Sequence, residues 1–382
     1  MFDLTDTQKN TRGWAREFAE REIAPNAASM DKAGDFPRDV MRAMLEAGLM
    51  GMLVPQEYGG RGATMLEYAT AVEEVARADA SASLVMAIHS SLVTALLSEF
   101  ASEEMKKAHL PALATKSVGA FALTEEDPSD PTRAEDEGKT FSATGTKMYI
   151  TNGPVADLIV LFAITGQVEV EKGGKTSTRD EVSALLVDAP VEGLVRSSAG
   201  SKLGLSAAPV GRLAFDGVKI PATRLVGERG QGFRMAMKAL DGGRIAAAAM
   251  GVGIGQAALE AAVRYARTRV TQGQPIAKFQ AVQFMIAEAS TRLEAARSLT
   301  YQAASMADRG EPVTKIAAQA KLFASEAASF VASRSLQVHG GAGVVRDLHP
   351  VERYLRDARV LEIIEGTSEI QKLVVAGQEL KG

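Results

Sequence analysis

Three long, alanine-rich segments in the second half of the chain place the strongest constraint on its fold. Apolar residues recur at helical spacing over residues 233–267, 279–307 and 312–338. In the first segment, small residues that would let packed helices approach closely stand at Gly243, Ala246 to Ala249, Gly251, Gly253 and Gly255. Helices of this length pack well as antiparallel neighbours at shallow angles, so residues 227–382 are predicted to form a bundle of long helices.

The two regions that precede this bundle have different patterns. Residues 1–118 show helical periodicity, broken by a turn cluster at 55–62. Over 119–226 the apolar runs are short and separated by turn residues, at 140–150, 158–164, 182–187 and 211–218. The polar segment 166–181 between two of these runs predicts a protruding hairpin or a mobile loop. We therefore predict an α+β chain with an N-terminal helical domain (1–118), a central β-barrel or sandwich domain (119–226) and a C-terminal long-helix bundle (227–382).

Composition narrows the function. A net charge of −4 over 382 residues argues against binding to a nucleic-acid backbone. The absence of cysteine excludes disulfides and thiolate chemistry, and four histidines without ligand spacing predict no metal site. No apolar run reaches the roughly 18 residues expected of a membrane span, and the first residues do not have the pattern of a signal or transit peptide. A cytoplasmic protein is predicted.

The segment from Arg353 to Gln371 carries the strongest candidate for chemistry. Glu365 stands between an apolar pair and Gly366, and Ser368 with Gln371 has the spacing of a capping box that opens the last helix. Burial at such a junction would raise the pKa of the carboxyl group toward neutrality, as a general base requires. The pattern by itself favours an ordinary acidic residue at the start of a helix.

This segment resembles the C-terminal signature of the acyl-CoA dehydrogenase family, in which this Glu removes the α-proton of an acyl thioester. Four further blocks resemble the same family in order, at 123–125 (LTE), 149–153 (YITNG), 240–244 (LDGGR) and 337–344 (QVHGGAGV). The resemblance covers essentially the whole chain. It implies the helical, β, helical architecture, an FAD cofactor, a tetramer built as a dimer of dimers and an electron-transfer flavoprotein as electron acceptor.

The resemblance also implies which residues hold FAD. An aromatic residue at Tyr149 would lie against the isoalloxazine ring and Thr151 would hydrogen-bond its N5 edge, whereas the pattern alone fits a plain strand-to-turn transition. Arg269 would grip the pyrophosphate of the FAD in the neighbouring subunit. The full set of implied FAD contacts is Phe121, Leu123, Thr124, Ser129, Tyr149, Thr151, Arg269, Thr271, Phe279, Gln280, Gln337, Gly340, Gly341, Thr367 and Glu369.

Two departures from the family pattern concern this cofactor. The loop Glu126–Pro131 is shorter than is usual in the family and does not end in Gly-Ser-Asp, which puts flavin affinity or the class of substrate in question. Gln272 replaces the Phe of the family's Arg-x-x-Phe-Gly motif, which should weaken packing on the adenine side.

On the substrate side, Asp241 and Arg244 match the family's contacts to coenzyme A, and Ser129 and Gly366 are further implied contacts. An ion pair between helix positions i and i+3 explains Asp241 and Arg244 equally well. Gly243 occupies a position at which some family members carry their catalytic Glu, so Glu365 is the candidate base.

The implied reaction is α,β-dehydrogenation of an acyl-CoA to a trans-2-enoyl-CoA, with hydride transfer to flavin N5. The backbone N–H of Glu365 and a flavin ribityl hydroxyl would polarise the thioester carbonyl. The sequence Ser83 to Met86 lacks the Arg of members that act on glutaryl thioesters, which favours a neutral acyl chain. An enoyl thioester reductase, an acyl-carrier-protein-dependent oxidase and an elimination enzyme are the alternatives on the same fold. A non-catalytic helical scaffold is a further alternative, which predicts a colourless protein.

Overall fold

The structure, a computed structural model, describes residues 3–172 and 175–381. Its N-terminal part consists of helices packed on one another. Two of them begin with capping boxes, in which Thr5 pairs with Gln8 and Thr64 with Glu67. The elements of this part are α1 (Asp6–Phe18), η1 (Ala19–Ile23), η2 (Ala24–Asn26), α2 (Ala27–Ala33), α3 (Arg38–Glu46), η3 (Gln56–Tyr58), α4 (Met65–Ala78), α5 (Ala80–Ala87), η4 (Ile88–Thr94), α6 (Ala95–Phe100) and α7 (Glu103–Thr115).

A single mixed sheet forms the central part. Its strands are β1 (Gly119–Ala122), β2 (Arg133–Asp136), β3 (Thr140–Thr151), β4 (Leu158–Lys172), β5 (Lys175–Asp188), β6 (Leu194–Ser198), β7 (Val210–Pro221) and β8 (Leu225–Val226). The short helix η5 (Ala222–Arg224) connects β7 to β8. The strand order is β6-β7-β3-β2-β4-β5-β8, and β1 pairs with β4 in parallel. The four strands predicted from the sequence lie within β3, β4, β5 and β7.

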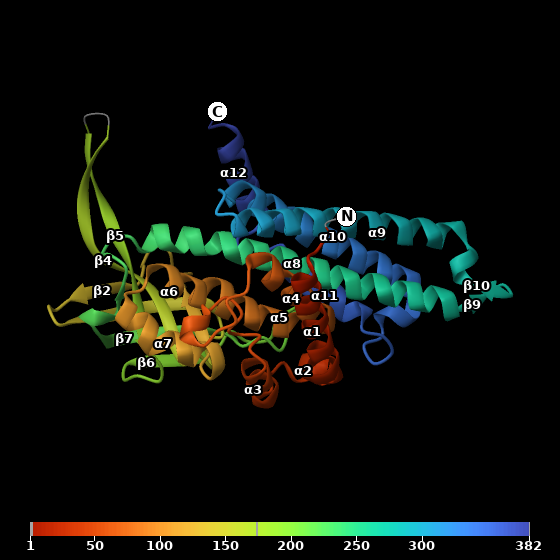
Figure 1. Ribbon diagram of the computed structural model, residues 1–382, viewed down its shortest axis with the longest axis horizontal. Helices are drawn as coiled ribbons and strands as arrows, with labels where there is room; N and C mark the ends of the chain where they lie inside the picture. Colours follow the sequence, from red (N-terminus) through yellow and green to blue (C-terminus); the bar gives the residue numbers. More distant parts are fainter. Residues whose placement is uncertain (1–2, 173–174, 382) are drawn as a thin grey trace.

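The polar segment 166–181 forms the outer part of the β4–β5 hairpin, whose ladder continues to the pair Lys172 and Lys175. This hairpin projects away from the rest of the molecule (Figure 1). The prediction of a protruding hairpin is confirmed, while Gly173 and Gly174 lie outside the described residues.

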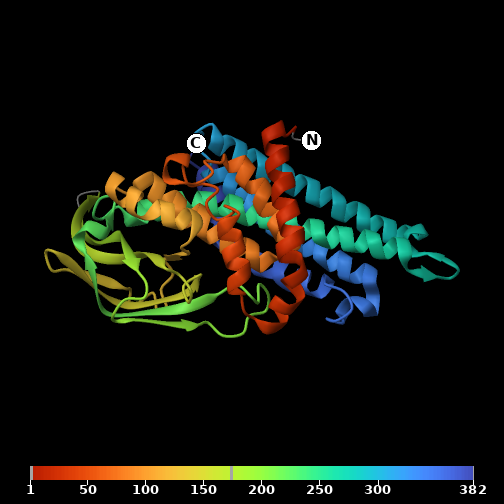
Figure 2. The same cartoon turned by 60° about the horizontal axis from the view of Figure 1, so that its bottom comes forward.

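The C-terminal part is the predicted set of long helices. It contains α8 (Gly232–Thr268), β9 (Val270–Thr271), β10 (Gln274–Pro275), η6 (Ile276–Lys278), α9 (Gln280–Asp308), α10 (Thr314–His339), η7 (Gly340–Val344), α11 (Val351–Leu361) and α12 (Ser368–Glu379). Figures 1 and 2 agree in placing the sheet at one end of the molecule and the β9–β10 hairpin at the other. The helical, β, helical order is confirmed; the domain boundaries at 118/119 and 226/227 stay a prediction.

The small residues of α8 have the packing role that the sequence indicates. A Cβ atom built at Gly253 would lie 2.2 Å from the carbonyl oxygen of Glu73 on α4. One built at Gly251 would lie 2.8 Å from the carbonyl oxygen of Ala324 on α10. Contacts this short leave no room for a side chain, so α8 can pack between α4 and α10 only with glycine at these positions.

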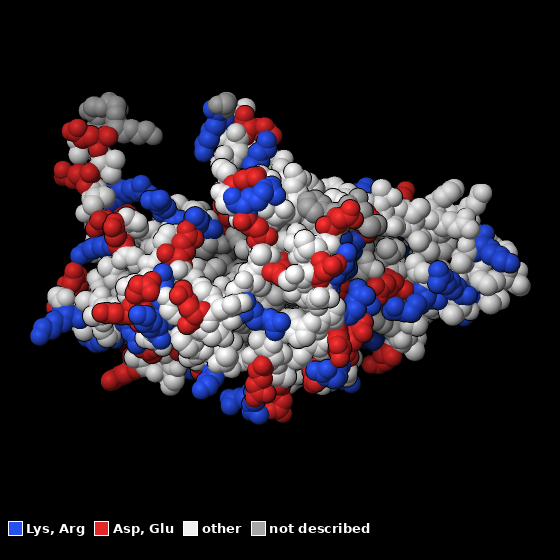
Figure 3. Space-filling view, viewed as in Figure 1, with Lys and Arg blue, Asp and Glu red and all other residues white. Residues whose placement is uncertain are grey.

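One expectation about apolar segments needs correction. The helical runs Ala80–Phe100 and Gly232–Thr268 are long and apolar enough to cross a membrane by length and composition. In each, however, most of the apolar window is buried inside the protein, 94% and 83% respectively, as is typical of core helices. These runs are apolar over such a length because a core helix that is covered on all sides needs no polar face. On the face shown in Figure 3, basic and acidic side chains are interspersed.

Candidate active site

Glu365 lies in the turn between α11 and α12, and its backbone is held in an uncommon conformation. Its φ is +55°, and that of Gly366 is +88°. The side-chain amide of Gln371, which is fully buried, donates to the carbonyl oxygens of both residues at 3.0 Å. Left-handed backbone in a residue other than glycine costs free energy and persists only where surrounding contacts enforce it. These two hydrogen bonds therefore fix the direction in which the Glu365 side chain leaves the chain.

The predicted capping box at this turn is wrong in detail. The N-cap of α12 is Thr367, whose hydroxyl accepts from the backbone N–H of Ile370 at 3.4 Å. Ser368 is instead the first residue of the helix, and Gln371 serves the turn rather than the cap. The physical reason is that two partly buried carbonyls of the turn need a donor, and the Gln371 amide supplies it.

The Glu365 carboxylate points into the protein, toward α8. Its Oε2 atom is buried and has no hydrogen-bond partner among the described residues. A Cβ atom built at Gly243 would lie 2.4 Å from this oxygen and 2.9 Å from Cδ2 of Leu92 on η4. The two positions considered for a catalytic Glu, 243 and 365, thus face the same point in space, and the absence of a side chain at one makes room for the carboxylate of the other.

Burial controls the proton affinity of this group. Loss of hydration raises the pKa of Glu365 to about 7, and the nearby charges of Lys321 and Arg244 only partly oppose the rise. A carboxyl group with this pKa can take and return a proton at neutral pH.

The cations around Glu365 come from two helices. Arg244 on α8 is buried, and its guanidinium donates to Asp241 Oδ1 at 2.6 Å. The other carboxylate oxygen of Asp241 accepts from the Thr314 hydroxyl at 2.7 Å. The i,i+3 ion pair that the sequence allows is therefore formed. Lys321 on α10 is fully buried and donates to the carbonyl oxygen of Gly366 at 2.5 Å.

Apolar and hydroxyl side chains close the space on the remaining side. Leu92 is almost fully buried, and Tyr68 on α4 is fully buried. Burial, with a contribution from the nearby Glu365 charge, raises the pKa of the Tyr68 hydroxyl. Sequence patterns did not indicate Tyr68, Leu92 or Lys321, because in α4, η4 and α10 they read as ordinary members of helices.

The predicted flavin contacts of the sheet region lie on β1, at the end of β3 and on the segment that follows β1. Tyr149 is 68% exposed and has φ +59°, and it lies at a register shift between β3 and β7. Thr151 ends β3 and is half-buried. Asn152, just beyond, is buried and donates to the carbonyl oxygens of Val85 and Gly119, both at 3.1 Å. That side chain ties the end of β3 to α5 and β1, a role that its Asn-Gly context did not indicate.

The segment that follows β1 is strapped to β3. Lys147 is buried, and its ammonium donates to Glu125 Oε1 at 2.5 Å and to the carbonyl oxygen of Leu123 at 3.1 Å. Leu123 is half-buried and Thr124 is exposed, with its carbonyl accepting from Met148 N–H at 3.0 Å. Phe121 on β1 is buried against Phe162, with ring centroids 4.8 Å apart.

Ser129 lies in the shortened loop and forms its hydrogen bonds with another residue of that loop. Its backbone N–H and hydroxyl both donate to Asp127 Oδ1, at 2.8 and 2.7 Å. The residue is exposed. The loop is therefore closed on itself by a local turn.

A second group of predicted contacts lies at the far end of α8. Arg269, Thr271, Phe279, Gln280, Gln337, Gly340 and Gly341 are grouped around the β9–β10 hairpin and the end of α10, and all except the half-buried Phe279 are exposed. Val338, Tyr265 and Ile276 pack together here, which joins these segments. The rings of Tyr265, His339 and His349 also form a cluster at this end, with the two histidine ring centroids 4.9 Å apart.

The two groups cannot share a ligand within one chain. Gly243 and Arg269 are separated along α8 by about 40 Å, at 1.5 Å per helical residue. Figure 1 shows the sheet and the β9–β10 hairpin at opposite ends of the molecule. The turn that contains Glu365, Gly366 and Thr367 lies against the part of α8 that carries Asp241 and Arg244. Glu369 is exposed on the first turn of α12.

The residues present suit FAD at both ends. An exposed aromatic side chain on β3 offers a face to a flat ring. At the far end, an exposed Arg269 stands near glycines whose added Cβ atoms would meet nothing within 4 Å, so a phosphate could approach the backbone closely.

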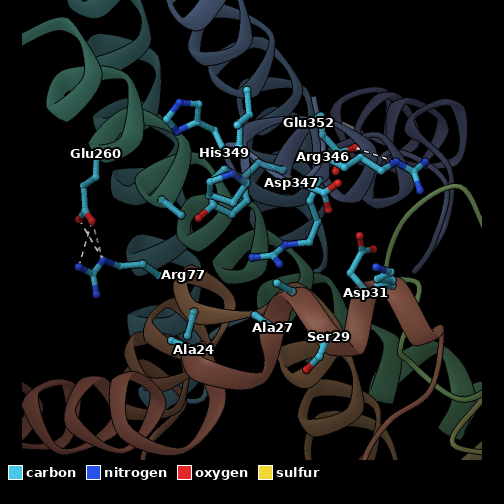
Figure 4. A pocket seen from close by; sticks show the side chains of 18 of the residues that line it. Ala24, Ala27, Ser29, Asp31, Arg77, Glu260, Arg346, Asp347, His349 and Glu352 are labelled. Carbon is cyan, nitrogen blue, oxygen red and sulfur yellow. Dashed lines mark hydrogen bonds and ion pairs between the residues drawn. The ribbon is translucent and has the colours of Figure 1, made fainter. Parts of the chain in front are cut away.

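A cavity of about 860 Å³ lies elsewhere, between α2, the end of α4, α8 and residues 346–354. Charged side chains of both signs surround it, and Arg77 is paired with Glu260 (Figure 4). None of the sequence-predicted site residues lines it. We therefore locate the candidate active site at Glu365, not at this cavity.

Comparison with known proteins agrees with this assignment. The profile of the acyl-CoA dehydrogenase N-terminal domain matches residues 5–117, and that of the acyl-CoA dehydrogenase C-terminal domain matches residues 230–380. The chain is 42% identical to a probable acyl-CoA dehydrogenase of Bacillus subtilis, YngJ, with all of both chains covered. It is 42% identical to the mitochondrial short-chain specific acyl-CoA dehydrogenase of Bos taurus, covering 99% of this chain and 91% of that protein.

Among solved structures, butyryl-CoA dehydrogenase from Megasphaera elsdenii matches with a TM-score of 0.93 and 35% identity, with both chains fully covered. The fold and the site therefore define an oxidoreductase of the flavoprotein class. The chain belongs to the acyl-CoA dehydrogenase family.

Proposed function

We propose that this protein dehydrogenates a short, neutral acyl-CoA thioester to the trans-2-enoyl-CoA, with Glu365 as the base that removes the α-proton. The observation that carries the proposal is the buried Oε2 of Glu365, which has no partner among the described residues and faces the space at Gly243. A carboxylate in this state is free to accept a proton from a substrate carbon. The two hydrogen bonds from the Gln371 amide fix the direction of the Glu365 side chain, which lowers the entropic part of the activation barrier for proton removal.

FAD, when bound, supplies the acceptor for the β-hydrogen. We propose that Tyr149, Thr151, Phe121, Leu123 and Thr124 hold its ring system at the sheet end. The backbone N–H of Glu365 is proposed to polarise the thioester carbonyl, because it lies beside the base in the same turn. Asp241, Arg244, Ser129 and Gly366 are proposed to lie on the coenzyme A side, with the Asp241–Arg244 pair shaping the wall of that region.

The proposed short acyl chain follows from the side chains next to the base. Tyr68 and Leu92 are buried beside Glu365, and we propose that they limit the length of acyl chain that can lie next to the base. Two similar proteins, the short-chain enzyme of Bos taurus and butyryl-CoA dehydrogenase, are named for short substrates.

We further propose that the protein works as an oligomer, a tetramer in the family's arrangement. We propose that the FAD contacts predicted at the far end of α8 serve the FAD of a neighbouring subunit, because Arg269 lies about 40 Å from Gly243 of its own chain. These contacts are Arg269, Thr271, Phe279, Gln280, Gln337, Gly340 and Gly341. Large apolar side chains stand exposed on α9 and α12, including Phe284 (62%) and Leu373 (69%), and such patches are typical of interfaces. Thr367 and Glu369 are proposed as additional FAD contacts. An electron-transfer flavoprotein is the proposed acceptor, and a cytoplasmic location stays a prediction.

The test is a steady-state assay of purified holoenzyme with an artificial electron acceptor and a panel of saturated acyl-CoA thioesters. We expect turnover that is highest with four- to six-carbon chains, and we expect Glu365→Gln to lower it by at least ~10²-fold while the protein still binds flavin. Near-normal turnover in that variant would refute Glu365 as the base. Silence across the panel together with turnover of acyl-carrier-protein thioesters would favour the oxidase alternative.

A further inference from the structure

Lys321 is the buried cation whose placement the proposed reaction does not yet explain. Its side chain is fully buried on α10 among alanines that include Ala317, Ala320 and Ala324. Among the described residues, Glu365, Glu362 and Glu369 act on its ammonium through their charge, and none of them forms a hydrogen bond with it. Its hydrogen-bond partner is the carbonyl oxygen of Gly366, at 2.5 Å. A buried ammonium without a direct counter-ion is unfavourable for folding, which calls for a functional explanation.

The hydrogen bond reaches the turn that carries Glu365. Gly366 directly follows Glu365, and both have positive φ values, +88° and +55°. The carbonyl of Gly366 accepts from two donors, Lys321 and Gln371, and the carbonyl of Glu365 accepts from Gln371. Side chains from two helices, α10 and α12, thus hold the two left-handed residues. Removing either donor leaves a buried carbonyl less well satisfied and the turn freer to move.

The other titratable and charged groups near Glu365 are paired, neutral or exposed, which distinguishes them from Lys321. Arg244 on α8 is committed to Asp241 at 2.6 Å, which largely balances its charge. Tyr68 on α4 is neutral, because its hydroxyl pKa is raised.

On the turn itself, Glu362 receives the Ser329 hydroxyl and is paired with Arg359 at 3.2 Å, and Glu369 is exposed to water. Among these groups, Lys321 is the buried positive charge near Glu365 that no carboxylate balances by direct contact. In a poorly hydrated interior such a charge acts strongly on its neighbours.

We propose that Lys321 is a positioning residue for the base. It anchors the Glu365–Gly366 turn through the Gly366 carbonyl, and its ammonium favours the ionised form of the Glu365 carboxylate while that carboxylate waits for substrate. The inference rests on the proposed role of Glu365. It assigns no contact between Lys321 and the substrate.

The pKa shifts agree with this arrangement. Burial raises the pKa of Glu365, and the Lys321 charge is the first of the influences that oppose the rise. Burial lowers the pKa of Lys321 to about 8, and the Glu365 charge is the first of those that oppose this fall. Turnover should therefore rise as Glu365 loses its proton and fall again as Lys321 loses its own. The two groups titrate as a coupled pair, so the limbs of the pH profile belong to the pair.

The experiment compares Lys321→Met, Lys321→Gln and Lys321→Arg with the unchanged holoenzyme. Lys315→Met is the matched control, because Lys315 lies on the same helix but pairs at the surface with Glu379, at 2.7 Å. In the Met and Gln variants we expect the acid limb of the turnover profile to move to higher pH by at least about one pH unit, the usual scale for losing an adjacent opposite charge. We expect the Arg variant and the control to keep the original limb.

A readout independent of turnover is an infrared pH titration of the Glu365 carboxyl band, assigned by its loss in Glu365→Gln. The band should show protonated carboxyl persisting to higher pH in the Met and Gln variants than in the unchanged protein. Lower melting temperatures with an unmoved acid limb and an unmoved band would reduce Lys321 to a packing residue and overturn the proposal. An Arg variant with the same displaced limb as the Met variant would also overturn it, because the positive charge would then not be the cause.

The outcomes also separate this inference from the proposed function. If Glu365→Gln retains full turnover, the proposed function fails. If that variant is inactive while Lys321→Met keeps the original pH profile and infrared titration, only the role of Lys321 fails.

Discussion

Gly243 on α8 lies directly against the carboxylate of Glu365, so close that an added Cβ atom would stand 2.4 Å from Oε2. The missing side chain at one position is what allows the carboxylate of the other to occupy the space. The base and the helix wall are therefore matched to each other, and this pairing gives the first prediction.

Gly243→Ala should lower turnover by about 10²-fold, because a displacement of the base by about 1 Å is enough for such a loss. Stability should change little, since the preference of a helix for Ala over Gly, about 1 kcal/mol, offsets the cost of displacing the ends of the Glu365 and Leu92 side chains. Steady-state kinetics and thermal melts measure the two effects. Gly242→Ala is the control, because its added Cβ would meet only atoms at 3.5 Å or more. Equal activity of the two variants would contradict the proposed contact.

Glu365 should make stability depend on pH in a definite direction. Its pKa is raised from 4.5 to about 7 in the folded state, so between these values the folded protein holds a proton that the unfolded chain has released. The stabilisation is present below the lower value and is lost as pH rises through the higher one, on the order of 3 kcal/mol in total.

The side chain of Glu365→Gln cannot titrate at this position. We therefore subtract the free energy of unfolding of the variant from that of the unchanged protein, and we expect this difference to decrease as pH is raised from about 5 to about 8. Urea unfolding of both proteins at the two pH values gives this difference, in which the contributions of titrating groups that do not interact with Glu365 cancel. A difference independent of pH would show that the carboxyl group is hydrated in solution.

Gln272→Phe should slow the loss of FAD on dilution, because it restores the aromatic residue of the family motif at the β9–β10 turn. Gln272 has φ +50° and is exposed, so the new ring would point to solvent or to a neighbouring subunit rather than into its own core. Gln272→Asn is the control, since Asn tolerates this left-handed backbone without adding a ring. Flavin fluorescence after dilution is the measurement, and equal retention in all three proteins would show that the position does not matter for FAD.

Asn152→Ala should destabilise the protein by roughly 2–4 kcal/mol, because it removes the hydrogen bonds that the Asn152 amide donates to the carbonyls of Val85 and Gly119 and forces Ala into φ +65°. Asn152→Gly removes the same hydrogen bonds without the backbone strain, so it should be the milder variant. Chemical denaturation ranks the two. If Ala is no worse than Gly, the left-handed backbone at this position is not a source of strain.

Much of the architecture is predictable because it depends on local patterns. The helical periods of 233–267, 279–307 and 312–338 correspond to α8, α9 and α10, and the short apolar runs of 140–218 correspond to four strands of the sheet. The position of Glu365 at a loop between two helices is also correct. The capping box was wrong because Thr367 and Ser368 are chemically similar neighbours, and the choice between them depends on where the Gln371 amide is needed.

Other features of the site could not be predicted because they join residues that are distant in the sequence. Nothing in the segment around Lys321 indicates that its ammonium meets the Gly366 carbonyl, and nothing around Tyr68 or Leu92 places them beside Glu365. The same holds for Asn152, whose two partners lie on α5 and at the start of β1.

The sequence by itself determined which segments become helices and strands, and where a carboxylate stands between an apolar run and a glycine turn, because side-chain periodicity and turn chemistry act over a few residues. Only the tertiary structure decided that this carboxylate is buried, faces Gly243 and lies near Lys321. The physical reason is that dehydration and electrostatic interaction depend on which helices pack together, and packing brings into contact residues that the chain itself keeps far apart.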